Sequence, residues 1–299
     1  MLALLRFAAI LAVAGGAVVI GLMVWPVGRE PAAIALTGDV NRGAYLARAS
    51  GCIACHTDIT GGGAPLAGGA PLETAFGVFY PPNLTTDPDH GIGAWTVEDF
   101  AKAVRQGISP YGEPYFPTFT YPFYANFSDQ EIADLWTAFQ TVPPVPAPSP
   151  AHDVPFPVNQ RWGLKLWRAV FLTRPETDPV DGRSTAWNRG RELVRGAAHC
   201  GACHTPRNLA GARSRAAAFA GNENLPGGGN APSLLTADLR AKGWTVENLA
   251  FALRTGVMPD GDAFGGSMGE VVQGGTAFLT DADLTAMATY LLDSERPTP

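Results

Sequence analysis

The sequence has few charged residues and no excess of positive charge. Only 16% of its 299 residues are charged, and the formal net charge is −6. Nucleic-acid-binding proteins ordinarily carry a basic patch or stripe, so this balance argues against a nucleic acid as a partner. The 46% of hydrophobic residues excludes a disordered chain, because disorder goes with low hydrophobicity and high net charge.

Cysteine is also scarce, and its four copies are placed informatively. They form two Cys-x-x-Cys-His motifs, with Cys52, Cys55 and His56 in the first and Cys200, Cys203 and His204 in the second. Zinc-binding cysteine pairs usually lie about 15–20 residues apart, and a thioredoxin-like site has no fixed histidine after its pair. Cys-x-x-Cys-His is the attachment signature of a c-type haem, whose iron the histidine ligates. We therefore expect two covalently bound haem c groups.

An uncharged apolar run lies near the N-terminus. It extends over 19 residues from Phe7 to Trp25, and a helix of that length, at about 1.5 Å per residue, nearly spans the ~30 Å hydrocarbon layer of a bilayer. Signal peptides usually have an apolar region of about 7–15 residues, although residues 33–35 offer a small-residue cleavage site. We expect residues 1–27 to be a retained transmembrane anchor. The positive flank at Arg6 favours a cytoplasmic N-terminus.

The rest of the chain is an internal duplication. Segments 95–107 and 244–256 match at eight of thirteen positions, and each follows one of the two motifs. The 35 glycines and 26 prolines suit short helices joined by irregular loops, with little sheet. We expect an all-α fold with two tandem domains, at 36–142 and 183–295, joined by a proline-rich linker and a connecting helix at 143–182.

The duplicated segments carry helix signals. Thr96 with Asp99, and Ser128 with Glu131, fit the N-terminal capping pattern, while Gly107 is a natural helix stop. Apolar residues at i, i+3, i+4 and i+7 then give each helix one buried face, and Met287 lies on that face of the last helix, so we expect it in the core.

Residues 39–295 resemble class I cytochromes c in tandem, and most of all the cytochrome c subunits of membrane-bound periplasmic dehydrogenases such as quinoprotein alcohol dehydrogenase. The stretches that carry the resemblance are Gly-Ile-Gly-x-Trp-Thr at Gly91–Thr96, Met-Gly-Glu-Val-Val at Met268–Val272, and Phe156-Pro157 with Trp167 and Phe171-Leu172. Those subunits usually carry three haem groups, whereas this chain has two motifs.

The resemblance implies roles for residues outside the motifs. The carbonyls of Pro82 and Pro232 would accept the N–H of the two iron-binding histidines and fix their rings. Trp95 and Trp244 would lie near the haem propionates, with plain core packing as the alternative. Met268, in a glycine-rich loop before the last helix, would be the second ligand of the second iron.

The first iron is expected to differ, because the sequence has no methionine between Met23 and Met258. Phe119 stands where Met268 stands in the second half, 24 residues after the corresponding tryptophan. Ligation by His90, ligation by His152 from the linker, and a five-coordinate or water-bound iron remain open. His199, beside Cys200, is interpreted as local to the second motif.

The leading functional hypothesis is electron transfer rather than catalysis. The chain would take electrons from a periplasmic dehydrogenase or another redox protein and pass them to a soluble cytochrome or terminal oxidase, with its haem domains on the periplasmic side of the bacterial cytoplasmic membrane. The alternative is a haem enzyme or ligand sensor that uses the first haem, for example in thiosulfate oxidation or peroxide reduction. A third hypothesis is a structural tether. The aromatic, basic stretch 161–168 is expected to pack across the domain boundary, or else to touch the membrane surface.

Overall fold

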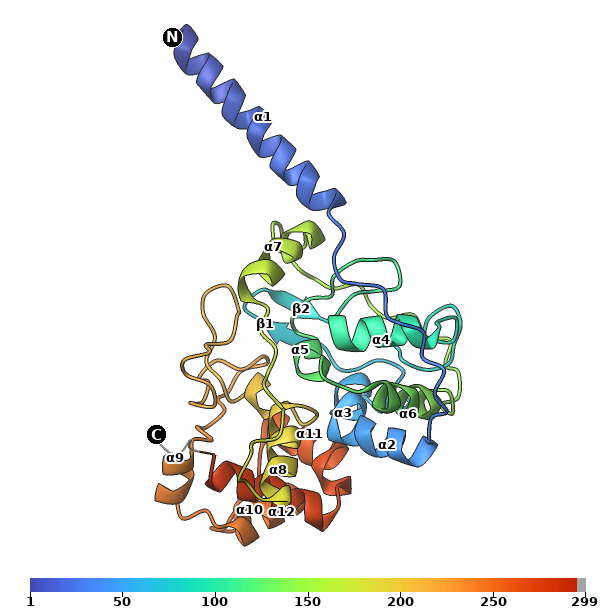
Figure 1. The fold of residues 1–299 in the computed structure, drawn as a ribbon, viewed down its shortest axis with the longest axis vertical. Coiled ribbons are helices and arrows are strands. Elements are labelled where there is room, and N and C mark those ends of the chain that lie inside the picture. The colour runs from blue at the N-terminus through green and yellow to red at the C-terminus, as the bar shows by residue number, and fades with distance from the viewer. Residues whose placement is uncertain (295–299) are drawn as a thin grey trace.

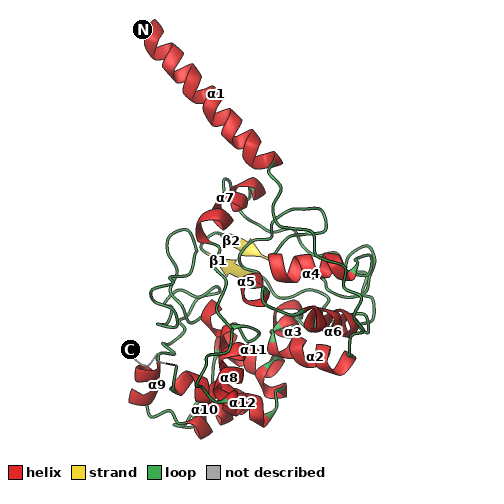
Figure 2. Cartoon of the chain, in the orientation of Figure 1, coloured by secondary structure: helices red, strands yellow, loops and turns green. Residues whose placement is uncertain are grey.

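The computed structural model describes residues 1–294, which are mainly helical with one small antiparallel hairpin (Figures 1 and 2). The elements in chain order are α1 (Leu2–Val24), α2 (Val40–Ala49), α3 (Cys52–His56), β1 (Leu72–Thr74), β2 (Gly77–Phe79), α4 (Val97–Gln106), α5 (Tyr121–Tyr124), α6 (Asp129–Phe139), α7 (Arg161–Phe171), α8 (Thr185–Arg195), the 3₁₀ turn η1 (Cys200–Ala202), α9 (Thr236–Ala241), α10 (Val246–Thr255), α11 (Gly266–Gly274), the 3₁₀ turn η2 (Thr276–Phe278) and α12 (Asp281–Leu292). The last residue of the expected domain 183–295 lies outside the described residues.

Helix α1 projects away from the rest of the molecule (Figure 1). Within it, Leu5–Val24 has a mean hydropathy of 2.5 and none of its apolar window is buried in the protein. By length and composition it is the one helix in the described range that could cross a membrane. Most of its described side chains are exposed, for example Val13 at 73% and Val24 at 75%.

The two halves repeat one helix crossing. Helix α2 packs on α6, and α8 packs on α12. A Cβ atom at Gly43 would lie 1.9 Å from the carbonyl oxygen of Asp134, and one at Gly190 would lie 1.9 Å from that of Ala286. Glycine is therefore required at both crossings, because the backbones approach too closely for any side chain.

The expected helix ends are confirmed. Thr96 and Asp99 form a complete capping box at the start of α4, and Ser128 and Glu131 form another at the start of α6. Gly107 ends α4 with φ of 62°, in the left-handed region where glycine has no steric penalty.

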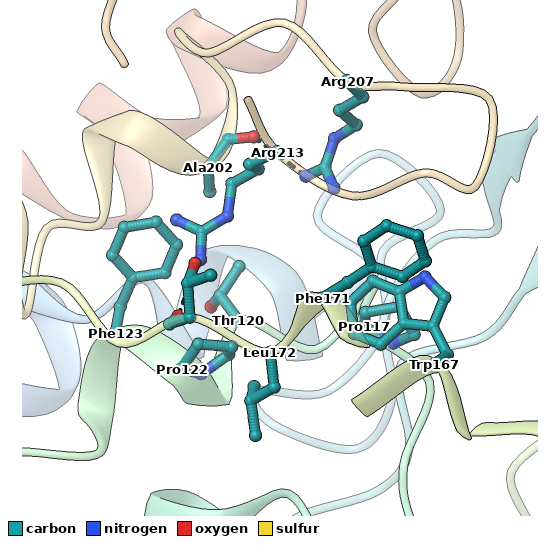
Figure 3. Close-up of a pocket in the computed structure, with 11 residues that line it drawn as sticks. Pro117, Thr120, Pro122, Phe123, Trp167, Phe171, Leu172, Ala202, Arg207 and Arg213 are labelled. Carbon is teal, nitrogen blue, oxygen red and sulfur yellow. Dashed lines mark hydrogen bonds between the residues drawn. The ribbon is translucent and has the colours of Figure 1, made fainter. Parts of the chain in front are cut away.

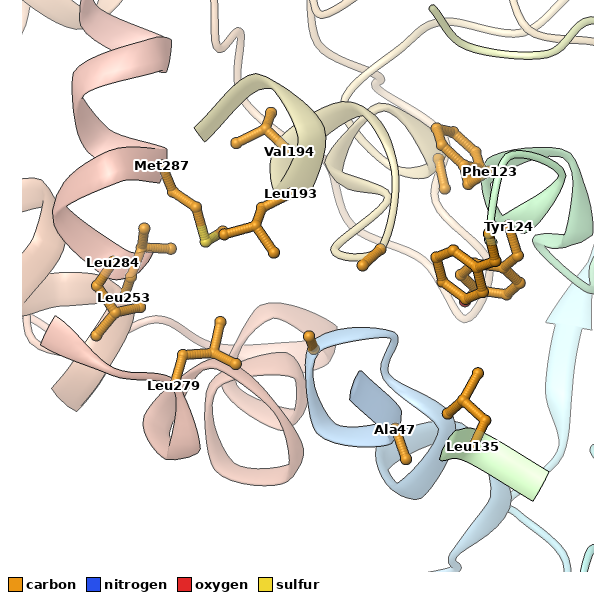
Figure 4. Close-up of a cluster of buried hydrophobic side chains, with 14 of the residues drawn as sticks. Ala47, Phe123, Tyr124, Leu135, Leu193, Val194, Leu253, Leu279, Leu284 and Met287 are labelled. Carbon is orange, nitrogen blue, oxygen red and sulfur yellow. The ribbon is translucent and has the colours of Figure 1, made fainter. Parts of the chain in front are cut away.

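Most buried apolar side chains of both halves belong to one contiguous cluster (Figure 4), while Phe79, Phe116, Val154 and Leu164 form a smaller second cluster. Leu135 of α6 is 2% exposed, Leu193 of α8 is 1% exposed and Met287 of α12 is fully buried. Met287 is thus a core residue, as its place on the inward stripe of α12 predicted. Because the cluster is continuous, the halves are held together by packing as well as by the linker.

The linker between the halves is extended and hydrogen-bonded to the first half. The Asn83 side chain donates to the carbonyls of Val145 at 2.8 Å and Ala147 at 3.0 Å, and the Asn83 backbone N–H donates to Ser149 Oγ at 2.8 Å. Downstream, the indole N–H of Trp167 in α7 donates to the carbonyl of Ala210 at 2.8 Å, which joins the connecting helix to the second half.

Two local features differ from the sequence-based expectation. Met268 lies in helix α11 rather than in a loop. Strands β1 and β2 form a hairpin in which Leu72 pairs with Phe79, which adds a small sheet to an otherwise helical fold.

Candidate functional site

Each Cys-x-x-Cys-His motif begins at a tight turn of the backbone. The residue before the first cysteine adopts a left-handed conformation in both halves, with φ of 67° at Gly51 and 39° at His199. Helix α3 then holds the whole first motif, whereas η1 holds the start of the second. In a helical turn, residues i, i+3 and i+4 share one face, so the two thiols and the imidazole of the first motif project together.

The imidazoles of both motifs are held in one orientation. His56 Nδ1 lies 2.7 Å from the carbonyl oxygen of Pro82, and His204 Nδ1 lies 2.7 Å from that of Pro232. A carbonyl only accepts, so Nδ1 must carry the proton and Nε2 is left with a free lone pair. Burial lowers the pKa of His56 and of His204, which favours this neutral form. An unprotonated Nε2 is what an iron ligand requires.

The thiols of Cys52, Cys200 and Cys203 are partly buried. Burial raises the pKa of Cys52 and Cys200 to about 12 and that of Cys55 to about 11. All three are therefore neutral thiols at pH 7. The Cys55 side chain is nevertheless exposed. An accessible thiol beside an oriented imidazole is what covalent attachment of a haem requires.

The donor chemistry fits haem rather than zinc. Within residues 1–294, no group of three or more His, Cys, Asp or Glu side chains is arranged to hold a metal ion directly. Two thiols beside one oriented imidazole suit a group that brings its own metal, is bonded through sulfur, and takes one nitrogen ligand.

The two motifs lie against each other, and the first half reaches the second through α5. His199, next to Cys200, makes ring contacts with Phe123 at 6.0 Å and with Tyr124 at 5.8 Å between centroids. The Tyr124 hydroxyl donates to the carbonyl of Ser50 at 2.7 Å and lies 3.3 Å from His199 Nδ1. Tyr124 therefore links the residues that precede both motifs.

The second half reaches the first motif in the same manner, through α11 and η2. A Cβ atom at Gly274, the last residue of α11, would lie 2.7 Å from Cβ of Ala54, inside the first motif. The guanidinium of Arg48 stacks 4.0 Å over the ring of Phe278. In each half, the segment before the last helix thus packs beside the attachment motif of the other half.

A small cavity of about 20 Å³, room for about one water molecule, marks this interface (Figure 3). Its walls come from α5, from α7 and from the loop after the second motif. The Arg213 guanidinium stacks 4.0 Å over the Phe123 ring, and Ala202 lies beside Arg213 in Figure 3. Burial beside Arg207 lowers the pKa of Arg213 to about 10, so its charge is partly desolvated by the contact.

A larger cavity of about 540 Å³ separates the halves elsewhere, between α2, α6, α8 and α12. Two ion pairs stand on its walls, with Arg42 Nε at 2.7 Å from Asp134 Oδ2 and Arg189 Nη2 at 2.9 Å from Asp283 Oδ2. The Tyr45 hydroxyl crosses the interface and donates to Asp283 Oδ2 at 2.6 Å.

The residues proposed near the second coordination position of each iron lie in contrasting surroundings. Met268 is partly buried and packs against the main core. Phe119 lies in an aromatic group, with ring centroids 6.0 Å from Tyr115, 6.0 Å from Tyr121 and 6.1 Å from Tyr124. The first half therefore has an aromatic wall where the second half has a thioether.

The two alternative histidines lie in different surroundings. The His90 side chain is exposed, while its backbone N–H donates to Asp87 Oδ1 at 2.7 Å. His152 accepts a hydrogen bond from the Tyr80 backbone N–H at 3.2 Å and contacts the ring of Phe79. Ligation by either histidine stays a prediction.

Trp95 and Trp244 are both partly buried and pack against the main core. This packing agrees with either of the roles considered for them, so their place beside haem propionates stays a prediction.

Sequence reasoning missed the bridge between the motifs. His199 Nδ1 lies 2.9 Å from the carbonyl oxygen of Ala197, beside its own motif, but its imidazole also contacts Tyr124 and lies 3.2 Å from the position of a Cβ on Gly51. The one available signal in the sequence is that Gly51 and His199 occupy equivalent positions, each directly before the first cysteine of a motif. Tyr124 has no motif of its own.

Comparison with known proteins identifies the family, although no family model matches the chain. A dihaem c-type cytochrome from Cereibacter sphaeroides is 40% identical over 275 residues, which cover 89% of this chain and 90% of that protein. The cytochrome c subunit of a quinone alcohol dehydrogenase from Gluconobacter oxydans is 37% identical over 92% of this chain and 59% of the subunit. The cytochrome c subunit of a gluconate 2-dehydrogenase from Pantoea cypripedii is 38% identical over 84% of this chain and 58% of the subunit.

The chain thus matches nearly the whole of the first relative but less than two thirds of the two dehydrogenase subunits. All three are named as c-type cytochromes, which implies covalently bound haem c, and the name of the first supports two groups. These relatives support electron transfer and give no support to a haem enzyme or ligand sensor. With its two oriented histidines and four thiols, the chain belongs to the family of dihaem c-type cytochromes.

Proposed function

We propose that this protein relays electrons from a periplasmic dehydrogenase, through two haem c groups in tandem cytochrome c domains, to a soluble cytochrome or terminal oxidase. Helix α1 anchors it in the bacterial cytoplasmic membrane, with both domains on the periplasmic side. The names of the dehydrogenase subunits among its relatives support such a donor.

In this proposal the residues of each motif have distinct tasks. The thiols of Cys52 and Cys55, and those of Cys200 and Cys203, bond to the two haem groups. His56 and His204 ligate the irons through Nε2. When bound, haem c supplies one-electron oxidation and reduction at its iron. The Pro82 and Pro232 carbonyls fix the rings and increase the basicity of the ligating nitrogens.

The second positions of the irons are proposed to differ. Met268 ligates the second iron, and a methionine ligand raises the reduction potential relative to a second histidine. The first iron has no methionine from its own half, and His90 is the candidate ligand. With His90 as ligand, the first haem would have the lower potential, which would favour electron transfer from the first haem to the second.

The observation that carries the proposal is the contact between the motifs. The second cysteines of the two motifs are close enough for Cys203 to contribute to the raised pKa of Cys55, after burial itself. Attachment edges that face each other would leave a short path between the two haem groups.

The test uses the full chain matured in a host that attaches haem c. We expect two covalent haem groups per chain by mass and by pyridine haemochrome absorbance, and two separate one-electron waves in protein-film voltammetry. The C52S/C55S and C200S/C203S variants should each keep one group and one wave. Two waves at the same potential in the wild type would contradict the proposed direction, and a chain that matures without covalent haem would contradict the whole proposal.

A partner assay complements the voltammetry. A purified quinone-dependent dehydrogenase with its substrate should reduce both haem groups of the full chain, as followed by the reduced-haem absorbance. Chemical reduction by dithionite serves as the control for intact redox centres. If dithionite reduces the protein but no periplasmic dehydrogenase does, the proposed donor is wrong while the relay remains.

A further inference from the structure

Helix α7 has the reverse of the usual surface pattern. A helix on the surface of a water-soluble domain turns its charged side chains to solvent and its apolar side chains to the core. In α7 the exposed positions are Leu166 at 53%, Ala169 and Val170 at 63%, which share one face of the helix. The exposed face of α7 is therefore apolar.

The cationic side chains of α7 are turned to the protein. Arg161 donates to the carbonyl of Pro114 at 2.9 Å, and Arg168 donates to that of Gln106 at 2.8 Å. The Arg168 guanidinium also lies 5.0 Å from the centre of the Tyr121 ring. These contacts fix the rotation of α7 about its own axis. They therefore fix which face of the helix is exposed, and that face is the apolar one.

The membrane-length helix α1 ends against α7. Lys165 Nζ donates to the carbonyls of Met23 at 2.8 Å and Trp25 at 2.7 Å. These are carbonyls at the C-terminal end of α1, where no further turn of helix supplies a donor. In Figure 1 α7 lies beside this lower end of α1, at the top of the globular part. A bilayer crossed by α1 would therefore have its surface at the level of α7.

Two further exposed aromatic side chains flank α1 and α7 in the sequence. Trp25, directly after α1, is 67% exposed, and Phe156, five residues before α7, is 79% exposed. Tryptophan is enriched where a membrane meets water, because its ring is apolar and its N–H is polar.

We propose that α7 lies in the interfacial layer of the bilayer that α1 crosses, with Leu166 and Val170 inserted among the upper acyl chains. The proposal rests on the proposed membrane anchor and adds a second contact, which fixes the orientation of the haem domains on the membrane. The continuity of α7 with the end of α1 through Lys165 favours a lipid surface over a protein partner. A helix that lies in the membrane plane with one apolar face buried is a known mode of attachment.

The experiment is photolabelling of the full haem-loaded chain in vesicles of phosphatidylethanolamine and phosphatidylglycerol. The probe is an uncharged aryl diazirine that partitions into the bilayer, and labelled peptides are identified by mass spectrometry. Helix α10 is the matched control, because Phe251 is 56% exposed there and α10 lies at the opposite end of the molecule from α1. We expect label in α1 and α7, several-fold above that in α10.

A double variant, L166S/V170S, provides the second measurement. Both side chains are exposed, so the change leaves the packing intact, as visible absorbance and circular dichroism would verify. We expect it to remove the label from α7 and to leave that in α1 unchanged.

The outcomes separate the two proposals. Label in α1 with α7 no higher than α10 would overturn the docking of α7 and leave the anchor in place, and a protein partner would then be the occupant of this face. Equal, low labelling of α1, α7 and α10 would overturn the anchor and the docking together, without bearing on electron transfer.

Discussion

Removal of one oxygen atom, in Tyr124→Phe, tests the bridge between the two motifs. The hydroxyl accepts from Thr120 Oγ1 at 2.8 Å and donates to the Ser50 carbonyl at 2.7 Å. It also lies 3.3 Å from His199 Nδ1. The Tyr124 side chain is 5% exposed, so phenylalanine fits the same space and the change isolates the hydrogen bonds from the packing.

The expected cost follows from these partners. A net hydrogen bond contributes about 0.5–1.5 kcal/mol, and a buried acceptor left without its donor costs about 1–3 kcal/mol. Ser50 is 2% exposed, so water cannot easily replace the lost donor. We therefore expect Tyr124→Phe to lower the free energy of unfolding by about 1–3 kcal/mol. Guanidinium unfolding of the haem-loaded chain, followed by far-ultraviolet circular dichroism, measures it.

The matched control is Tyr111→Phe. Tyr111 is 92% exposed, and exposed substitutions usually change stability by less than about 0.5 kcal/mol. If both variants unfold within that margin of the wild type, the Tyr124 hydroxyl does not stabilise the interface and the reasoning fails.

Three other predictions follow from the contacts described. Gly190→Ala should lower the free energy of unfolding by about 1–3 kcal/mol or more, because its Cβ would collide with a backbone carbonyl. Gly163→Ala in α7, where a Cβ would have nothing within 4 Å, should instead raise the free energy of unfolding by about 0.5–1 kcal/mol. Equal effects of the two variants in chemical unfolding would contradict the close helix crossing at Gly190. Met268→Leu should abolish the methionine-to-iron absorption band and lower one reduction potential, and a band that persists would exclude Met268 as a ligand. Burial, aided by Arg213, lowers the pKa of His199 below 6.5, so the unfolded chain binds the proton at higher pH than the folded chain does. The free energy of unfolding should therefore fall as the pH drops below about 6.5. His199→Asn should lessen this fall, and an unchanged pH profile of unfolding in the variant would contradict the prediction.

The predictions that succeeded depend on local chemistry. The capping boxes at Thr96 and Ser128 and the stop at Gly107 require only a few neighbouring residues, and all were readable from the sequence. The buried stripe that holds Met287 follows from helical periodicity alone. Such features are fixed before the halves of the chain meet.

Helix α11, which the sequence predicts as a loop, shows where reasoning from neighbouring residues fails. Glycines at 265, 266 and 269 lower the helix propensity around Met268, so the sequence favours a loop. In the structure the same segment packs against the first motif, with Gly274 at close range to Ala54. Tertiary packing outweighs a propensity difference of about 1 kcal/mol per glycine. The first motif supplies that packing, and neither half of the sequence taken alone indicates that it would.

The same packing bears on the missing methionine of the first half. A methionine bonded to iron ties its loop to the centre of a cytochrome domain, and Phe119 cannot make such a bond. Helix α5, which follows Phe119, is instead buried at all four of its residues. The Phe123 ring contacts both His199 and the guanidinium of Arg213, and the Tyr124 hydroxyl donates a hydrogen bond to the carbonyl of Ser50.

In the proposed arrangement, contact with the second half therefore replaces the lost iron–sulfur tether. The loop over the first haem is then ordered by the neighbouring motif rather than by its own iron. An exogenous ligand that enters the first site would have to displace aromatic side chains that also support the second site. The asymmetry between the two halves is thus a property of their interface as much as of the residue at position 119.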